Sequence, residues 1–551
     1  MTGRAPFAWE KSYAPGARWD APIARCTLPQ LLDRAVARYG DGVAIEFRDV
    51  SLSFAELGRR VDAMAAALLR AGLGPGATVA LYLPNTPWHP AAFFGASRAG
   101  ARIVHLSPLD AERVLAHKLR DSGARTLFAT DLGTSLLPTA VRLLDAGLLD
   151  RVIVGEDAAW GGDGPRTALP DRPDVIPVSR FAAAASPPPS WPEQSIDDVA
   201  LLQYTGGTTG LPKGAMLTHG NLTAAVSMYN AWLEGQGLSR PGADRVIGVL
   251  PLFHIYALTT ILLRQIDRGN TILLRARFDV EQTIRDIEQG RATSFPGVPT
   301  MWIALANHPG VDKVDFSSMI HCASGGAPLP VEVARRFERL TGRRLVGGWG
   351  MTETSPAGTN LPENGPSKPG TIGIPLPGVE LDIVSLDDPT RTLPPGEVGE
   401  LRVRGLNVTK GYWNRPEETA QSFVGDRFLT GDVGYMDEDG FFFIVDRKKD
   451  MIISGGFNVY PQMIEQAIYE HPAVAECIVL GVPDEYRGEA AKAFVTLRDG
   501  AEPFSMDDLR LFLADKVGKH EMPTALEFRA SLPRTPVGKL SRAELRKEAS
   551  P

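Results

Sequence analysis

The sequence predicts an α/β protein in which a large body of sheets and helices precedes a small α+β domain. Over residues 41–154, apolar stretches of strand length alternate with amphipathic stretches of helix length, which is typical of parallel sheets covered by helices. After the charged run Asp446–Asp450, the pattern changes to short strands and helices over about a hundred residues, enough for a separate core. A chain of 551 residues has room for several such units.

The first elements follow from their apolar runs. Thr78–Pro84 is expected to be a buried strand, Trp88–Ala99 a helix and Ala101–Leu106 the next strand. Residues 155–193 are rich in Pro, Gly, Asp and Ala. We interpret them as a surface excursion within one body, because such a composition is typical of loops.

The later elements are shorter. Further strands are expected at Val199–Leu202, Ala215–Thr218 and Gly440–Val445. The small domain is expected to contain helices near Pro461–His471 and Ser505–Asp515 and strands near Val474–Val482 and Ala490–Leu497.

The composition excludes several classes of protein. The 58 Lys and Arg against 65 Asp and Glu give a formal net charge of −7, so nucleic acid is not an expected partner. Cys26, Cys322 and Cys477 are too few and too scattered for a disulfide framework or a metal cluster. The chain lacks the apolar core of a signal peptide and the ~20 apolar residues of a membrane span. We expect a cytoplasmic enzyme whose contact with membranes, if any, is peripheral.

The most conspicuous motif is a loop rich in glycine and threonine at Tyr204–Gly214. It lies between two strand-like runs, and its glycines expose backbone N–H groups while the threonines add hydroxyls and the lysine adds a charge. Such a loop suits a polyphosphate, whereas the structural alternative is a simple hairpin turn. The candidate phosphate-binding residues are Thr205, Gly206, Gly207, Thr208, Thr209, Gly210 and Lys213.

This loop resembles the phosphate loop of the AMP-forming ligases, which include acyl-CoA synthetases, nonribosomal peptide adenylation domains and firefly-type luciferases. Gly206 stands where serine is usual, as in many fatty acyl-CoA ligases. With the motifs described next, the resemblance extends over roughly residues 25–545 and is strongest to bacterial fatty acyl-CoA ligases. It implies an acid- and ATP-binding domain of sheet-and-helix subdomains at 1–448 and a small mobile domain at 449–551.

A second motif, Gly348–Pro356, resembles the family's adenine and magnesium segment. An aromatic ring can stack on adenine, and a carboxylate can hold the Mg²⁺ that bridges phosphate oxygens. The resemblance implies that Trp349 contacts the adenine, Thr352 the α-phosphate and Glu353 the metal. Trp349 replaces the usual tyrosine, so a hydrogen bond made by that phenol would be lost.

Two further motifs resemble the ribose site and the hinge. In Phe428–Val433, the family pattern assigns Asp432 to the ribose hydroxyls, and Arg447 is the matching second contact. Lys449 falls at the family's hinge, so we interpret the charged run around it as a pivot whose exposed residues change backbone conformation.

The small domain carries two more family motifs. Ile453–Pro461 resembles the loop that borders the pantetheine tunnel during thioester formation, which implies that role for Gly456. Pro533–Arg542 matches the family's catalytic-lysine pattern, which implies that Lys539 orients the carboxylate and neutralises charge at the α-phosphate. In related bacterial enzymes a protein acetyltransferase can modify this lysine, and acetylation would remove its charge.

Three weaker candidates concern the acyl pocket. His254, in Pro251–Ala257, resembles the histidine that lines the acid and CoA channel, and its alternative role is that of a core histidine. Gly326, in Cys322–Pro328, resembles the strand edge on which the acid lies. Arg264 is expected to face solvent from an apolar helix; alternatively it pairs with the second carboxylate of a dicarboxylic acid.

The sequence therefore predicts an acid–CoA ligase. The resemblance implies that ATP activates a carboxylic acid as acyl-AMP with Mg²⁺ and that coenzyme A then takes the acyl group, releasing AMP. A medium- or long-chain fatty acid is the expected substrate, with aromatic and dicarboxylic acids left open. The alternative is an adenylating enzyme that loads a separate carrier protein. Oligomeric state is left open.

Overall fold

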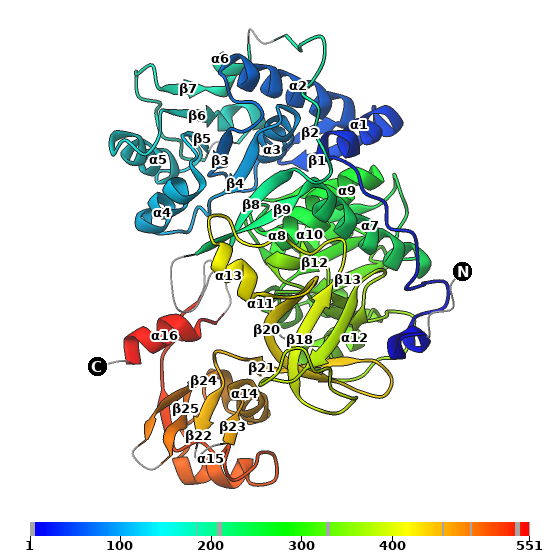
Figure 1. Ribbon diagram of the computed structural model, residues 1–551, viewed down its shortest axis with the longest axis vertical. Coiled ribbons are helices and arrows are strands. Elements are labelled where there is room, and N and C mark those ends of the chain that lie inside the picture. The colour runs from blue at the N-terminus through cyan, green and yellow to red at the C-terminus, as the bar shows by residue number, and fades with distance from the viewer. Residues whose placement is uncertain are drawn as a thin grey trace. The chain divides into compact units, whose positions relative to one another are not determined.

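The computed structural model describes residues 6–162, 164–183, 186–205, 212–326, 331–454, 457–484, 487–534 and 540–549 (Figure 1). The chain packs as two compact units. The first comprises the described residues up to Glu380 together with Arg404–Phe423, and the second comprises Leu381–Val403 and the described residues from Val424 onward. Among the helices of this described part, none is long and apolar enough to cross a membrane.

A seven-stranded sheet occupies the first part of unit 1, counted over the described residues. Its order is β7-β6-β5-β3-β4-β8-β9, and all neighbours are parallel except β8 and β9. The inner strands are buried on both faces, which explains their continuous apolar runs. The strands are β3 (Thr78–Leu81), β4 (Arg102–His105), β5 (Thr126–Thr130), β6 (Arg151–Gly155), β7 (Val175–Pro177), β8 (Val199–Thr205) and β9 (Lys213–Thr218).

A second sheet of unit 1 has nine strands among the described residues. Its order is β16-β15-β14-β13-β12-β10-β11-β1-β2, and the strands from β14 to β1 are parallel. The strands are β1 (Val43–Phe47), β2 (Val50–Ser53), β10 (Arg245–Gly248), β11 (Thr271–Leu274), β12 (Ser294–Gly297), β13 (His321–Ser324), β14 (Leu345–Trp349), β15 (Thr359–Asn360) and β16 (Ile374–Pro375).

Helices of unit 1 join the two sheets into one apolar core. Residues of α1, α2 and α3 pack in a single buried cluster with β1 and β11 of one sheet and β3 and β8 of the other. Every residue of α3 is buried, as expected for a helix covered on all sides. The longer helices are α1 (Leu28–Tyr39), α2 (Phe54–Arg70), α3 (Trp88–Arg98), α4 (Glu112–Ser122), α5 (Leu136–Asp145), α7 (His219–Gly235), α10 (Val280–Glu288), α11 (Pro299–Asn307) and α12 (Val331–Thr341).

Shorter helical segments connect these elements. A continuous helical run is formed by α8, the π-helix η3 and α9, as predicted for the segment after His254. The bounds are α6 (Val178–Ala182), α8 (Ile255–Ala257), η3 (Leu258–Leu263), α9 (Arg264–Arg268) and α13 (Pro416–Gln421).

Unit 2 contains two smaller sheets, each of five strands in the part of the chain described. The first has the order β17-β18-β20-β19, with β21 paired to β20; the second has the order β23-β22-β25-β24, with β26 paired to β25. The bounds are β17 (Glu380–Val384), β18 (Gly399–Arg404), β19 (Phe423–Val424), β20 (Arg427–Met436), β21 (Phe442–Arg447), β22 (Ile452–Ser454), β23 (Phe457–Val459), β24 (Val474–Asp484), β25 (Gly488–Leu497), β26 (Ala525–Phe528), α14 (Pro461–Tyr469), α15 (Met506–Leu513) and α16 (Arg542–Ala549).

The predicted elements agree with these bounds. The expected strands and helices correspond to β3, α3, β4, β8, β9, β21, α14, β24, β25 and α15. The end of the chain has its own apolar core, in which α14 and α15 pack on β24 and β25, so the predicted α+β arrangement is present. The boundary proposed between residues 448 and 449 lies inside unit 2 and stays a prediction.

The interpretation of residues 155–193 as only a surface excursion is wrong. Val175–Pro177 forms β7, the edge strand of the seven-stranded sheet, and α6 follows it. Trp160 is fully buried and lies edge-on against Trp88. This strand could not be predicted, because three residues are too few to show a periodic pattern and the surrounding composition, rich in Pro and Gly, indicates loops.

We expect the stability of unit 1 to fall with acidification. Burial lowers the pKa of His105 and of His219 to about 4 and lowers the pKa of His89 well below its ordinary value. Between pH 6.5 and 4 the histidines of the unfolded chain therefore bind protons that those of the folded chain do not. The free energy of unfolding is highest above pH 6.5 and decreases as the pH falls toward 4. His105 and His219 each account for on the order of 3 kcal/mol of this loss.

Thermal unfolding at pH 7.5 and pH 5 checks this expectation. His219→Asn keeps an acceptor for the N–H of Leu28, which now donates to His219 Nδ1 at 3.2 Å, but it removes one titrating group. The variant should lose less thermal stability on acidification than the wild type, whereas His520→Gln, at an exposed position, should behave like the wild type. An equal loss in all three proteins would contradict the role of buried histidines.

Candidate active site

Three of the predicted site segments follow strands of the nine-stranded sheet. His254 comes after β10, Gly326 after β13, and Thr352 and Glu353 after β14. These strands run parallel, so their carboxyl ends share one edge, which is where open α/β sheets bind ligands. Contacts between the segments agree with this placement: Thr259 donates to the backbone oxygen of Ser355 at 2.9 Å.

The Gly- and Thr-rich segment connects an antiparallel pair of strands. Thr205 ends β8, Lys213 begins β9, and the two residues are cross-strand partners. The hairpin suggested by the turn residues is therefore present, and this geometry is compatible with phosphate binding as well. Gly206, Gly207, Thr208, Thr209 and Gly210 lie outside the described residues.

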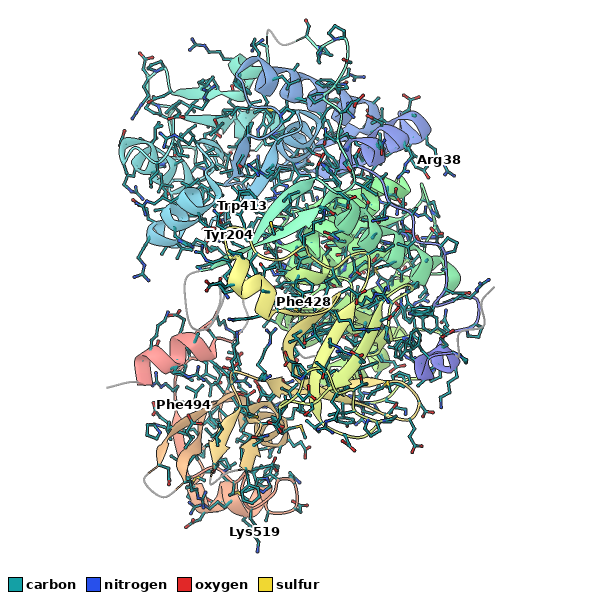
Figure 2. The ribbon with its side chains drawn as sticks, viewed as in Figure 1. Arg38, Tyr204, Trp413, Phe428, Phe494 and Lys519 are labelled. Carbon is teal, nitrogen blue, oxygen red and sulfur yellow. The ribbon has the colours of Figure 1, made fainter. Side chains whose placement is uncertain are left out.

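Side chains of α4 hold both ends of this hairpin. His117 Nε2 lies 3.0 Å from the backbone oxygen of Pro212, and the Tyr204 phenol donates to Asp121 Oδ2 at 2.6 Å. Burial and the neighbouring Asp121 raise the pKa of Tyr204 well above its ordinary value, so the phenol remains a donor. Trp413 also donates to the backbone oxygen of Asp121, at 3.1 Å; Figure 2 labels Tyr204 and Trp413.

A tight turn carries Thr352 and Glu353. It consists of the 3₁₀ helix Thr352–Thr354 followed by Ser355 in a left-handed conformation. The buried Asn407 amide donates to the backbone oxygens of Thr354 and Ala357, at 2.7 and 2.5 Å. The backbone of the turn is thus fixed by a residue far along the chain.

The Glu353 carboxylate is buried and has a specific partner. The Tyr412 phenol donates to Glu353 Oε1 at 2.7 Å, and the N–H of Thr409 donates to the backbone oxygen of Glu353 at 2.7 Å. The described residues contain no cluster of three or more His, Cys, Asp or Glu side chains suited to a metal. One carboxylate is nevertheless compatible with Mg²⁺ bound to ATP, since this ion takes one or two carboxylates together with phosphate oxygens and water.

The Trp349 ring lies over a glycine. A Cβ at Gly358 would come within 2.4 Å of the indole, so a larger residue would displace the ring. Trp349 itself is partly exposed at the end of β14, and its backbone N–H donates to Thr359 Oγ1 at 3.3 Å. Partial exposure of the side chain is compatible with stacking on a base.

The loop that carries His254 is held by two buried amides. Asn85 donates to the backbone oxygens of Gly248 and Leu250, and Gln203 donates to that of Phe253 at 3.0 Å. His254 is half-buried at the N-terminus of α8, where its Nδ1 accepts from the N–H of Tyr256 at 3.3 Å. This contact is compatible with a structural role as well as with the channel role.

The Tyr256 ring connects this loop with the end of β13. A Cβ at Gly325 would lie 2.8 Å from the ring, so glycine is required there for close packing. The next residue, Gly326, is exposed and has a φ of 79°. The predicted pocket residues His254 and Gly326 therefore lie on adjoining segments.

The expectation that Arg264 faces solvent is wrong. Its side chain is buried, Nε donates to Asn230 Oδ1 at 3.1 Å, and a terminal nitrogen donates to Ser239 Oγ at 3.0 Å. Burial lowers the pKa of the guanidinium to about 10, against the attraction of Asp244 and Asp267. These polar partners account for the buried arginine without a substrate carboxylate.

In unit 2, the two residues predicted for the ribose site lie together. Asp432 on β20 and Arg447 on β21 are cross-strand partners, and Arg447 Nε lies 2.5 Å from Asp432 Oδ1. Asp432 is buried and Arg447 is 44% exposed, so the pair offers a fixed carboxylate beside an accessible cation.

The charged run at the predicted hinge is only partly exposed. Arg447, Lys448 and Lys449 are exposed, but the flanking Asp446 and Asp450 are buried. The hinge at Lys449 stays a prediction: its basic residues have the exposure that a pivot requires, whereas its acidic ends are anchored.

The anchors are ion pairs with Arg542 of α16 and a hydrogen bond from the backbone of α14. Arg542 lies 3.4 Å from Asp446, 3.7 Å from Asp450 and 2.6 Å from Glu465. The N–H of Gln462 also donates to Asp446, at 2.8 Å. Gly456 and Lys539 lie outside the described residues, and their predicted roles remain predictions.

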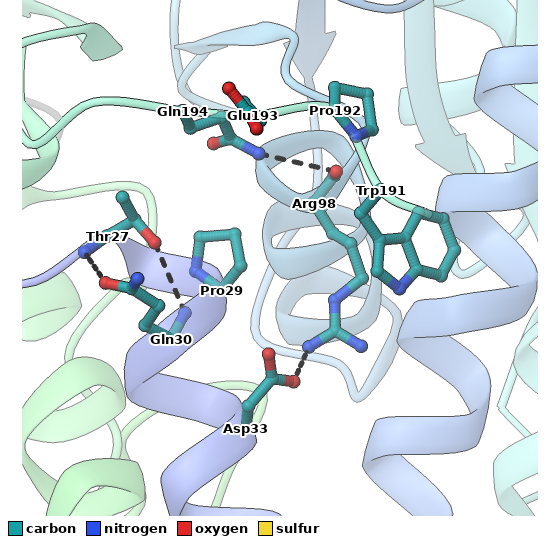
Figure 3. Close-up of a pocket in the computed structure, with 9 residues that line it drawn as sticks. All are labelled: Thr27, Pro29, Gln30, Asp33, Arg98, Trp191, Pro192, Glu193 and Gln194. Carbon is teal, nitrogen blue, oxygen red and sulfur yellow. Dashed lines mark hydrogen bonds and ion pairs between the residues drawn. The ribbon is translucent and has the colours of Figure 1, made fainter. Parts of the chain in front are cut away.

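A pocket of about 340 Å³ lies away from the predicted residues in unit 1 (Figure 3). Arg98, one of its lining residues, is paired with Asp33 and Asp62 and lies over the ring of Trp191. This arrangement neutralises a buried arginine. The lining residues are Thr27, Pro29, Gln30, Asp33, Arg98, Trp191, Pro192, Glu193 and Gln194.

Comparison with known proteins identifies the class that these loops define. Residues 32–413 match the model of the AMP-binding enzyme family, and residues 463–539 match that of the AMP-binding enzyme C-terminal domain. The chain belongs to the AMP-binding enzyme family. The family predicted from the motifs is thereby confirmed.

Named relatives cover nearly the whole chain. The long-chain-fatty-acid–CoA ligase of Bacillus subtilis (strain 168) is 38% identical over 557 residues, covering 98% of each protein. The feruloyl-CoA synthase of Amycolatopsis sp. is 39% identical over 506 residues, covering 92% of this chain and 95% of the relative. ATP-bound MatB from Rhodopseudomonas palustris is similar in structure, with a TM-score of 0.84 and 30% identity over 95% of this chain and 99% of that one. The predicted fold class is confirmed.

Three residues that hold the site were not among the predicted candidates. Asp121 anchors the hairpin, Asn407 fixes the turn of Glu353, and Tyr412 contacts the Glu353 carboxylate. Asn407 and Tyr412 lie in a polar loop, residues 405–415, that is rich in Gly, Asn and aromatic residues. That composition could have indicated a functional loop. Asp121 lies in an ordinary amphipathic helix, where no sequence pattern marks it as a contact of the site.

Gly350→Ala should disrupt the turn of Glu353. A Cβ at this position would lie 1.5 Å from the backbone oxygen of Pro356, and a backbone atom cannot move aside as a flexible side chain does. We expect MgATP affinity to fall at least about 10-fold, which isothermal titration calorimetry measures. Gly347→Ala is the matched control, because its Cβ would meet no atom closer than 3.8 Å and binding should be retained. Equal affinities of the two variants would contradict this account of the turn.

Proposed function

We propose that this protein ligates a long-chain fatty acid to coenzyme A through an acyl-AMP intermediate, with release of AMP and pyrophosphate. The observation that carries the proposal is the 38% identity, over 98% of both proteins, to a long-chain-fatty-acid–CoA ligase. The broader assignment, an AMP-forming acid–CoA ligase that uses ATP and CoA, follows from the family and from the names of these relatives.

A second substrate class has its own support. The feruloyl-CoA synthase that is 39% identical covers almost as much of the chain, so an aromatic acid is the second candidate. The acyl pocket is proposed to lie near Gly326, His254 and Tyr256. The buried residues Leu258, Ile261 and Leu262 follow on η3 and make this region apolar, which suits either acid.

In the first half-reaction a carboxylate oxygen of the acid attacks the α-phosphorus of ATP. We propose that Thr205, the glycines and threonines at 206–210, and Lys213 bind the phosphates from the hairpin, while Thr352 contacts the α-phosphate. Trp349 would stack on the adenine, and Asp432 and Arg447 would bind the ribose. Lys539 would stabilise the charge that develops on the attacked phosphate. No protein nucleophile is required.

Glu353 is the proposed Mg²⁺ ligand. Its burial and its hydrogen bond from Tyr412 support this role, because a carboxylate held in one orientation can bind an ion without first losing side-chain freedom. Mg²⁺, when bound with ATP, supplies positive charge to the phosphate oxygens.

In the second half-reaction the thiol of coenzyme A attacks the acyl-AMP. We propose that the small domain turns about Lys449 between the two reactions and that Gly456 then borders the CoA channel. Such alternation allows one pocket to serve two reactions.

A panel of carboxylic acids tests which substrate the protein uses. Pyrophosphate release and acyl-CoA formation are measured with fatty acids of 8 to 18 carbons (roughly the medium- to long-chain range), with ferulate and with a dicarboxylate. The proposal expects the highest kcat/KM for a long-chain acid, at least about 10-fold above ferulate. Higher turnover of ferulate would favour the aromatic candidate. Pyrophosphate release that yields thioester only with an added holo-carrier protein would overturn the CoA ligase.

Two substitutions that should each impair a different half-reaction test whether the small domain alternates between two positions. Lys539→Ala should lower adenylation by at least about 100-fold, because a charge stabiliser in the transition state is lost, yet it should retain thioester formation from supplied acyl-AMP. Gly456→Leu should retain adenylation and lower thioester formation. Single-turnover assays of each half-reaction measure both effects. Equal damage to both half-reactions in both variants would remove the support for alternation.

A further inference from the structure

Tyr412 connects two elements of the candidate active site in unit 1. Its backbone lies beside β9: Ala215 and Tyr412 form an antiparallel bridge, and the N–H of Trp413 donates to the backbone oxygen of Gly214 at 2.8 Å. The N–H of Met216 donates to the backbone oxygen of Gly411 at 2.9 Å. The position of Tyr412 is therefore fixed relative to the strand that begins with Lys213.

The phenol and the ring of Tyr412 contact groups of opposite charge. The hydroxyl donates to the buried Glu353 carboxylate at 2.7 Å, and Lys213 Nζ lies 5.3 Å from the centre of the ring. The ring attracts an ammonium through its negative face, while the hydroxyl restricts rotation of the carboxylate. One side chain thus contacts both an acidic and a basic group, and the Lys213 ammonium also lies 3.9 Å from Glu418.

The local backbone keeps this arrangement rigid. Gly411 has a φ of 118°, and a Cβ there would lie 2.2 Å from Thr419 Cγ2, so only glycine allows the turn into Tyr412. Thr419 Oγ1 accepts from the N–H of Tyr412 at 2.9 Å. Thr409, three residues before Tyr412, donates its N–H to the backbone oxygen of Glu353, so the same loop holds both ends of that glutamate.

We propose that Tyr412 is a positioning residue that aims the Glu353 carboxylate and Lys213 at one metal–triphosphate ligand. The inference rests on the proposed function, in which Glu353 binds Mg²⁺ and Lys213 binds phosphate. A purely structural tyrosine would stabilise the fold without changing how the protein binds a divalent cation, and this difference makes the two roles separable.

Tyr412→Phe is the sharpest test, because it removes only the hydroxyl and keeps the ring near Lys213. Mn²⁺, which replaces Mg²⁺ and is visible by electron paramagnetic resonance, is titrated into the full-length protein with saturating ATP and no acid. We expect Mn²⁺ to bind about 10-fold more weakly, the size of effect typical for loss of a group that orients a metal ligand. ATP binding without any divalent cation should change less than about 2-fold.

Two comparisons distinguish loss of the hydroxyl from loss of folding. Tyr412→Gln and Tyr412→Leu have similar volumes, but only glutamine keeps a donor, so Gln should bind Mn²⁺ more tightly than Leu. Tyr469→Phe is the matched control, since it also loses a phenol hydrogen bond, in this case with the backbone of Cys477, and it should bind Mn²⁺ like the wild type.

The outcomes separate the inference from the proposed function. Wild-type Mn²⁺ affinity in Tyr412→Phe, or equal affinities in the Gln and Leu variants, would overturn the positioning role. Glu353→Gln should weaken Mn²⁺ binding at least as much as Tyr412→Phe, and unchanged binding in that variant would overturn the metal assignment on which the inference rests. Weakened binding in Tyr412→Phe and Glu353→Gln but not in Tyr469→Phe, together with no acyl-CoA from any acid, would support the positioning role and overturn only the proposed ligase activity.

Discussion

The burial of parallel strands on both faces is the constraint on which unit 1 depends. Such strands cannot leave a face in water, so helices α1, α2 and α3 fill the space between the two sheets with one apolar core. Parallel strands also end at the same edge, and the segments after β10, β13 and β14 meet there. The requirement that stabilises the sheets thus gathers the candidate site, and the polar loops at this edge can vary without loss of the core.

Much of this arrangement could be predicted from the sequence because its signals are local. The apolar runs of β3, β4 and β8 lie in unbroken stretches of strand length, and α14 shows helical periodicity. The hairpin at Thr205 and Lys213, and the pair Asp432 and Arg447, were singled out by motifs of fewer than a dozen residues. The family assignment followed from their order along the chain, which no single motif could supply.

The parts that escaped prediction depend on contacts between distant residues. Asn407 reaches Thr354 across 53 positions, and Tyr412 reaches Glu353 across 59, so no local pattern links them. Arg264 was misplaced because a charged residue in an apolar helix usually reaches solvent; its partners Asn230 and Ser239 come from elsewhere in the chain. Buried polar groups need partners, but sequence alone does not say which partners they find.

The buried carboxylate of Asp446 adds a condition to the proposed pivot at Lys449. Asp446 belongs to β21 by its backbone, yet its side chain accepts from Gln462 and pairs with Arg542, which both follow Lys449 in the chain. A rotation at Lys449 would therefore have to break both contacts, leaving the N–H of Arg447, which donates to Asp446 at 2.7 Å, as a partner that precedes the pivot. A buried carboxylate that loses its cation is strongly destabilised. Arg542 would keep Glu465 and Asp450, which follow the pivot and would move with it. The rotated state must then expose Asp446 to water or give it a new cation. The adjacent Arg447 and Lys448 are exposed, but they already pair with Asp432 and Glu400, so either would have to exchange partners to take this role.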